Sequence, residues 1–117
     1  MLPPVTTTVL VVDDQDVVRQ VVRLALEGAG YVVHDTGSPS AAIAHVQGDS
    51  SIDLLVTDIV MPEMDAFELA ERVKSILPGV RVLYTSGYTD AGAEGHFLQK
   101  PFTPAELVAK VSAVLAS

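Results

Sequence analysis

Short apolar runs recur along the chain, separated by longer segments in which apolar residues return every three or four positions. The short runs predict strands at 9–12, 31–35, 52–57, 80–85 and 96–99. The run at 9–12 is apolar throughout, which is typical of a parallel strand whose sheet is covered by helices on both faces. We therefore expect a central parallel sheet with helices packed on it.

Helical periodicity follows the first two strands. The first helix is expected from Asp16 to the glycines within 28–30, with one buried stripe made of Val17, Val21, Leu24 and Ala25. Ser38 followed by Pro39 is a typical helix start, because serine caps the first turn and proline is tolerated at its first position. This second helix is expected to end near Gln47.

Two capping boxes predict the later helices. Asp65 and Glu68 precede one helix, whose apolar stripe is Leu69, Val73, Ile76 and Leu77. Thr103 and Glu106 precede a last helix, whose stripe is Leu107, Val111, Val114 and Leu115. Strands that alternate with helices in this way predict an α/β fold with a doubly wound parallel sheet and right-handed crossovers.

The connection between the fourth and fifth strands breaks the alternation. Residues 88–95 include Gly92 and Gly95 and carry no apolar stripe, so we expect a flexible loop there in place of a helix. Eight extended residues span up to about 28 Å, which is enough to return to a parallel neighbour. The sheet can therefore still form.

Composition favours one domain with an aliphatic core. The 117 residues are 49% hydrophobic but only 5% aromatic, and a chain of this length supports a single core. Residues 1–7, which hold two prolines and two threonines, are interpreted as a leader or linker, and 8–117 as the domain.

The net charge, the lack of cysteine and the lack of targeting features limit which partners and which cellular compartment are expected. A net charge of −8 argues against a nucleic-acid backbone or an anionic membrane as partner, because both are polyanions. No cysteine is present to form a disulfide or a thiolate zinc site. No apolar run approaches the ~20 residues of a membrane span, and 1–7 lacks the features of a signal peptide. We therefore expect a cytoplasmic location.

Polar side chains follow four of the expected strands: Asp13, Asp14, Asp58, Ser86 and Lys100. The carboxyl ends of parallel strands meet at one edge of the sheet, so these side chains are expected to converge. Crowded carboxylates repel one another and recruit a hard cation such as Mg²⁺. Asp58 could then attack a phosphoryl group that Lys100 and Ser86 stabilise. Each residue alone also fits an ordinary turn or helix cap; the joint placement favours a site.

Four motifs resemble those of the receiver domains of bacterial two-component response regulators: Val11-Val12-Asp13-Asp14, Thr57-Asp58-Ile59-Val60-Met61-Pro62, Thr85-Ser86-Gly87 and Lys100-Pro101-Phe102. The resemblance implies a flavodoxin-like sheet of order 2-1-3-4-5, with the fourth helix of that fold short or replaced by a loop. It also implies a protein that catalyses only its own phosphorylation and dephosphorylation, with a downstream protein as its target.

The same resemblance assigns roles to individual residues. It implies that Asp13, Asp14, Asp58 and the backbone carbonyl of Val60 bind Mg²⁺, and that Asp58 accepts a phosphoryl group from a histidine kinase or histidine phosphotransfer protein. Ser86 and Lys100 would contact the phosphoryl group, and Ser86 with the aromatic Phe97 would form the switch. The Lys100–Pro101 bond is expected to be cis.

One departure from the family pattern and two alternative functions remain open. Ala66 stands where the family places glycine, so a backbone with positive φ there is either strained or relaxed. A pseudo-receiver that binds proteins without being phosphorylated is one alternative. A phosphatase resembling haloacid-dehalogenase hydrolases is the other, but Gln15 stands where its Asp-x-Asp motif requires a second aspartate. The stretch 83–89 resembles the terminal receivers of hybrid histidine kinases.

The three histidines, His34, His45 and His96, are separated along the chain in a way that does not match metal-ligand spacing. We expect them to be solvated or to serve packing.

Overall fold

Five parallel strands form one sheet in the order β2-β1-β3-β4-β5. The computed structural model describes residues 6–87 and 96–117. The strands are β1 (Thr8–Val12), β2 (Val32–Thr36), β3 (Leu54–Asp58), β4 (Arg81–Ser86) and β5 (His96–Gln99). This confirms the expected doubly wound, flavodoxin-like sheet. The loop expected at 88–95 lies outside the described residues.

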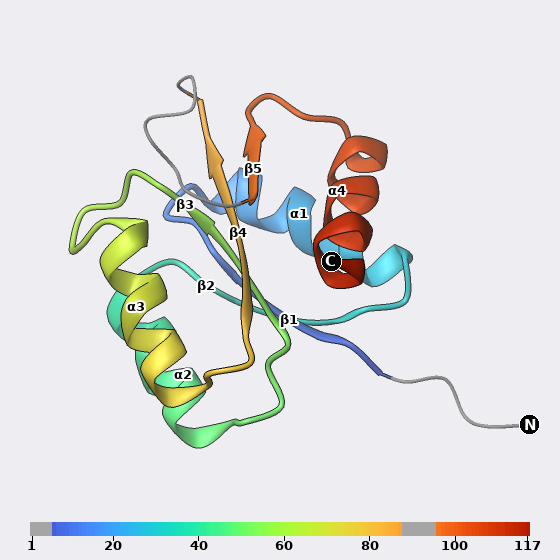
Figure 1. Ribbon diagram of the computed structural model, residues 1–117. Helices are drawn as coiled ribbons and strands as arrows, with labels where there is room; N and C mark the ends of the chain where they lie inside the picture. Colours follow the sequence, from blue (N-terminus) through green and yellow to red (C-terminus); the bar gives the residue numbers. More distant parts are fainter. Residues whose placement is uncertain (1–5, 88–95) are drawn as a thin grey trace, which may run out of the picture.

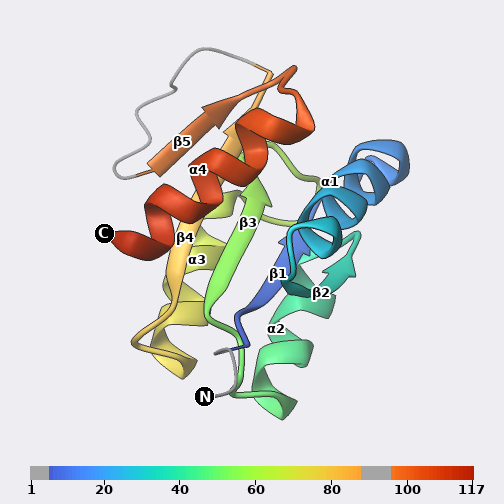
Figure 2. The same cartoon turned by 90° about the vertical axis from the view of Figure 1, so that its right-hand side faces the viewer.

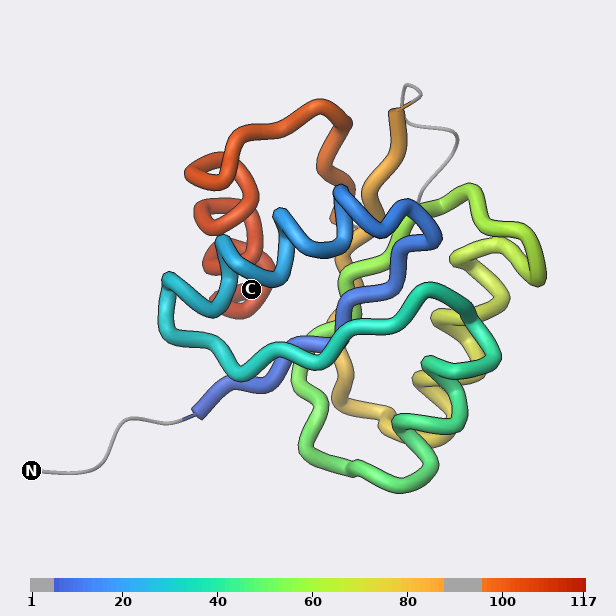
Figure 3. Tube along the Cα trace, turned by 180° about the vertical axis from the view of Figure 1, so that it is seen from behind, coloured from blue at the N-terminus to red at the C-terminus, as the bar shows by residue number. Residues whose placement is uncertain are grey.

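Four helices cover the two faces of this sheet within the described ranges. They are α1 (Asp16–Gly28), α2 (Pro39–Gly48), α3 (Ala66–Ile76) and α4 (Pro104–Ala116). Helices α1 and α4 lie in front of the sheet in Figure 2, and α2 and α3 lie behind it. The same two pairs stand on opposite sides of the sheet in Figures 1 and 3. No helix in the described part of the chain is long and apolar enough to cross a membrane.

Each face of the sheet has its own aliphatic core. Alternate residues of a strand point to opposite faces, so Leu10 packs toward α2 and α3 while Val9 and Val11 pack toward α1 and α4. Strand β3 lies at the centre of the sheet and is buried along its whole length. These burial patterns explain why the strands read as continuous apolar runs.

The buried face of α1 differs from the expected one. The predicted stripe was wrong at three of its positions, because Val17, Val21 and Leu24 are 75%, 45% and 62% exposed. The helix instead buries Val22 and Leu26, with Val18 and Ala25 packed against the same core. Two adjacent stripes of α1 are apolar, and periodicity alone cannot distinguish which of them faces the sheet.

The helix caps largely follow the sequence. Thr103 and Glu106 form the complete capping box of α4, and the Ser38 side chain accepts from the backbone N–H of Ala41 at the start of α2. At α3 the Asp65 side chain accepts from the Glu68 backbone N–H at 2.9 Å. The Glu68 carboxylate lies 3.7 Å from Arg72 instead of returning to the cap, so only half of that box is formed.

Ala66 occupies an unstrained position. It begins α3, is fully buried, and donates its backbone N–H to the Ile59 carbonyl at 3.3 Å. Among the described residues no residue other than glycine has a positive φ. The alanine therefore sits in relaxed helical backbone, and the strain considered from the sequence is absent at this position.

Candidate functional site

The carboxyl ends of β1, β3, β4 and β5 meet at one edge of the sheet, as Figure 2 shows. A cavity of about 510 Å³ opens at this edge and is lined by Asp14, Gln15, Asp58, Val60, Ser86, Gly87 and Lys100. Carboxylate oxygens of Asp13, Asp14 and Asp58 all lie within 4.8 Å of one another. The structure therefore brings the polar residues singled out in the sequence to one place.

Two hydrogen bonds fix the side chain of Asp13. One carboxylate oxygen accepts from the Gln15 backbone N–H, and the other accepts from Lys100 Nζ, both at 2.9 Å. Asp13 is only 3% exposed, whereas its neighbour Asp14 is exposed. The pair thus places one buried and one accessible carboxylate close to Asp58, and Asp14 lines the cavity.

Arg19 of α1 binds the backbone carbonyl of Asp13, a role that the sequence did not predict. Its Nη1 donates to the Asp13 carbonyl at 2.7 Å, and its Nε donates to Asp35 at 2.9 Å. A side-chain carbon at Gly37 would lie 3.0 Å from Arg19 Nη1, so glycine leaves room for this contact. The only signal in the sequence was a cation on a helix that directly follows the acidic pair.

Asp58 ends the central strand β3 and is 8% exposed. Burial raises the pKa of its carboxyl group above the ordinary value, and the nearby Asp13 charge adds to this, while Lys100 opposes it. Lys100 Nζ lies 3.5 Å from the Asp58 carboxylate. The carboxylate of Asp58 is therefore only partly compensated by its neighbours.

Backbone hydrogen bonds hold the residues beyond the strand ends to the sheet. The Ile59 N–H donates to the Thr85 carbonyl at 2.9 Å, and the Lys100 N–H donates to the Ser86 carbonyl at 2.7 Å. The Lys100–Pro101 peptide bond is cis, as expected. Ser86 is 1% exposed and lines the cavity beside Lys100.

Phe97 does not line the cavity. On β5 it pairs with Tyr84 of β4, and its half-buried ring packs against the core on the α2 and α3 side. Tyr84 in turn contacts Phe67 of α3, with ring centroids 5.0 Å apart. The ring is thus in contact with the core below Ser86 rather than with the cavity itself.

The charges of the cavity fit a hard divalent cation. Three carboxylates and the one ammonium leave two negative charges, and Lys100 is the only cationic side chain lining this cavity in the part of the chain that the structure describes. Oxygen ligands with room for several waters suit Mg²⁺. Val60 also lines the cavity, next to Asp58. The donor set and the charge balance therefore fit Mg²⁺.

Comparison with known proteins agrees with this geometry. The chain is 37% identical over 111 residues to the response regulator receiver protein CpdR of Brucella abortus, covering 88% of this chain and 91% of that protein. It is 34% identical over 119 residues to the sensor kinase CckA of the same organism, covering 94% of this chain. The chain spans only 13% of the length of that kinase.

Solved structures show the same fold. A crystal structure of a response regulator receiver protein from Sinorhizobium medicae superposes with a TM-score of 0.85 at 29% identity, covering 96% of each chain. The sequence profile of the response regulator receiver domain matches residues 9–112. This chain therefore belongs to the receiver domain family of two-component signalling.

Proposed function

We propose that this receiver accepts a phosphoryl group on Asp58 in a Mg²⁺-dependent reaction, and that a histidine kinase or histidine phosphotransfer protein donates it. The observation that carries the proposal is the position of Lys100, whose Nζ lies 2.9 Å from Asp13 and 3.5 Å from Asp58. One ammonium group can thereby contact both Asp13 and the acceptor Asp58. In this role the chain acts as a signalling switch that catalyses only its own phosphorylation and dephosphorylation.

The proposed step is an in-line transfer onto the Asp58 carboxylate. A carboxylate oxygen of Asp58 attacks phosphorus, the P–N bond to the donor histidine breaks, and the imidazole leaves with the electron pair and takes up a proton. Lys100 Nζ neutralises a phosphoryl oxygen, and the Ser86 hydroxyl donates to another. The product is an acyl phosphate, which water later hydrolyses.

Asp13, Asp14, Asp58 and the Val60 carbonyl would hold Mg²⁺, which supplies charge neutralisation for the phosphoryl oxygens. The remaining chemistry belongs to the chain itself. Asp13 positions Lys100 through their 2.9 Å contact, and Arg19 positions Asp13 through its carbonyl. These contacts prearrange the ammonium group before a phosphoryl group arrives.

The exposed stripe of α1 supports a protein donor. Val17, Val21 and Leu24 are three exposed apolar side chains on one stripe of α1, and exposed apolar surface of this kind is typical of protein interfaces. An apolar groove between α1 and 100–102 shares Gly87 and Lys100 with the acidic cavity. A histidine-bearing donor domain seated on this groove would present its phosphoryl group to Asp58.

Ser86 and Phe97 form the proposed switch. A phosphoryl group that draws the Ser86 hydroxyl toward it pulls on the end of β4, whose Tyr84 pairs with Phe97. Phe97 carries no hydroxyl, so its change of position would be driven by burial of the ring rather than by a new hydrogen bond. The downstream protein would read this change on the surface around β5.

Intact-mass measurement after incubation with acetyl phosphate tests the proposal. We expect wild type to gain one phosphoryl group with Mg²⁺ and none with EDTA, and Asp58→Asn to gain none. Glu71→Gln, an exposed carboxyl on α3, serves as the control and should behave as wild type. A wild-type protein that remains unmodified with Mg²⁺ and acetyl phosphate would contradict the proposal and favour a pseudo-receiver.

A further inference from the structure

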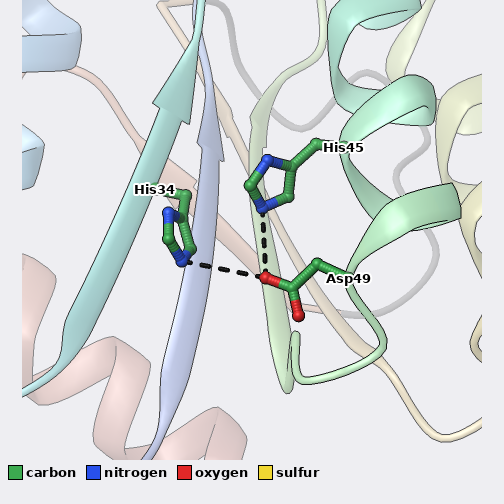
Figure 4. Close-up of side chains that lie close together, drawn as sticks. All are labelled: His34, His45 and Asp49. Atoms are coloured by element: carbon green, nitrogen blue, oxygen red, sulfur yellow. Dashed lines mark ion pairs between the residues drawn. The ribbon is translucent and has the colours of Figure 1, made fainter.

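Two of the three histidines lie together, although sequence reasoning treated all three as too scattered for a metal. His34 lies on β2, His45 on α2, and Asp49 caps the C-terminal end of α2, as Figure 4 shows. The two side chains are distant along the chain but near in space, with ring centroids 4.7 Å apart, because the turn between β2 and α2 folds the helix back against the strand. His96 stays apart on β5, with its Nε2 3.4 Å from the Ser117 hydroxyl.

The separations of the three side chains approach those of ligands on one metal ion. Asp49 Oδ2 lies 3.4 Å from His45 Nε2 and 3.9 Å from His34 Nε2, and all three ligand atoms lie within 4.8 Å of one another. Bonds of about 2.0–2.1 Å in a tetrahedral zinc site place neighbouring ligand atoms about 3.4 Å apart. Small side-chain rotations would therefore bring the three atoms to coordination distance.

His45 Nε2 is a buried polar atom whose hydrogen-bonding capacity is not satisfied. The atom is buried, and the described residues offer it no hydrogen bond. Asp49 is close enough, but the pair lacks hydrogen-bond geometry. A buried polar atom without a partner is costly, and metal coordination through its lone pair would satisfy it.

Asp49 is held in an orientation suited to a ligand. Its Oδ1 accepts from the Ser51 backbone N–H at 2.9 Å and from the Ser51 hydroxyl at 2.6 Å, which leaves Oδ2 facing the two imidazoles. These hydrogen bonds hold the pKa of the Asp49 carboxyl below its ordinary value, with a smaller contribution from the histidines. Ligating carboxylates in metal sites are commonly positioned by such hydrogen bonds.

We propose that His34, His45 and Asp49 bind a divalent transition-metal ion of the Zn²⁺ type, which links edge strand β2 to the end of α2. Two imidazole nitrogens and one carboxylate oxygen suit Zn²⁺ and exclude Mg²⁺, which prefers oxygen ligands. Three protein ligands leave a fourth position for water or for a side chain of another protein. The site shares no residue with the Asp58 cavity.

Zn²⁺ titration followed by calorimetry tests this site in the untagged full chain, with Mg²⁺ in large excess to occupy the acidic cavity. We expect one Zn²⁺ per wild-type chain, and a loss of affinity of at least about tenfold in His34→Gln and in His45→Gln. His96→Gln is the matched control and should bind as wild type. Equal affinity in all four proteins, or an equal loss in His96→Gln, would overturn the proposal.

Two further variants separate the metal site from folding and from phosphorylation. Ser51→Ala removes only the hydroxyl bond to Asp49, so it should weaken Zn²⁺ binding by about tenfold without replacing a ligand. Asp58→Asn should bind Zn²⁺ as wild type does, which keeps this test independent of the acceptor role. Substitution of Co²⁺ for Zn²⁺ should give the visible absorption of a tetrahedral site in wild type and not in His45→Gln; its absence in wild type would count against the proposal.

Discussion

Asp58 carries a charge that its surroundings disfavour, and this has a measurable effect on stability. Its pKa is raised by burial, with Asp13 adding and Lys100 opposing. A folded-state pKa above the unfolded value stabilises the fold fully at pH below the unfolded value, and this contribution is lost as pH rises through the folded value. At neutral pH the ionised carboxylate therefore destabilises the metal-free protein.

Replacing Asp58 by Asn should accordingly raise the Tm of the metal-free protein at pH 7. The difference from wild type should shrink as the pH falls toward the ordinary range for aspartate, because the carboxyl is then protonated in both states. Mg²⁺ should raise the Tm of wild type more than that of the variant. Thermal unfolding with and without EDTA measures both effects. A Tm for Asp58→Asn below that of Glu71→Gln at pH 7 would contradict the argument.

Lys100 is the residue on which the proposed transfer depends most. Its Nζ lies 2.9 Å from the Asp13 carboxylate and 3.5 Å from the Asp58 carboxylate. We expect Lys100→Ala to slow phosphorylation by acetyl phosphate about 100-fold or more, because a prearranged positive group is lost where charge develops. Lys100→Arg should recover part of the rate. An unchanged rate in Lys100→Ala, measured by mass at fixed times, would remove Lys100 from the mechanism.

At the scale of elements, α1 offers a paired test of which stripe is buried. Leu26 is fully buried while Leu24 is 62% exposed, on the same helix. Leu26→Ala should lower the free energy of unfolding by about 2–5 kcal/mol, because it leaves a cavity in the core. Leu24→Ala should change it by no more than about 0.5 kcal/mol. Urea unfolding of both variants makes the comparison, and equal losses would mean that the helix is rotated.

A truncation at Val21, which is 45% exposed and lines the groove proposed to receive the donor, tests docking: Val21→Ala should leave the fold intact. Because the substitution leaves the fold intact, a slower transfer from a phosphorylated histidine donor would come from weaker docking. Phosphorylation by acetyl phosphate, which needs no docking, should proceed at the wild-type rate. Equal effects on both donors would count against α1 as the docking helix.

The cap of α4 makes a second prediction for a single element. Thr103 accepts from the Glu106 backbone N–H at 3.1 Å, and the Glu106 side chain returns to the Thr103 N–H at 3.2 Å. Thr103→Ala should therefore cost about 1 kcal/mol of stability. Ser112→Ala, an exposed position within the same helix, is the control and should cost nothing measurable. Urea unfolding distinguishes the two.

At the scale of the whole molecule, the sequence predicted the features that follow from hydrophobic periodicity and from the order of elements along the chain. The strands, the helix positions and the meeting of Asp13, Asp58 and Lys100 follow from parallel strands whose ends share an edge. The features that the sequence did not predict depend on how the elements pack against one another in space. The buried stripe predicted for α1 was wrong because two adjacent stripes of the helix are apolar, and the contact between His34 and His45 joins elements whose facing residues no local pattern specifies.

The interstrand hydrogen bonds of the sheet continue one residue beyond the ends of β3 and β5. The amides of Ile59 and Lys100 are bonded to β4 as strand amides are, although both residues lie outside the strands. The Ile59 amide should then exchange with deuterated solvent as slowly as the amides of the central strands, since its exchange requires β3 and β4 to separate, whereas release of the edge strand β5 is enough to expose the Lys100 amide. Opening at the Asp58 end of β3 would therefore cost as much free energy as unfolding of the central strands, so a change that loosens the domain elsewhere should leave this end of the proposed site in place.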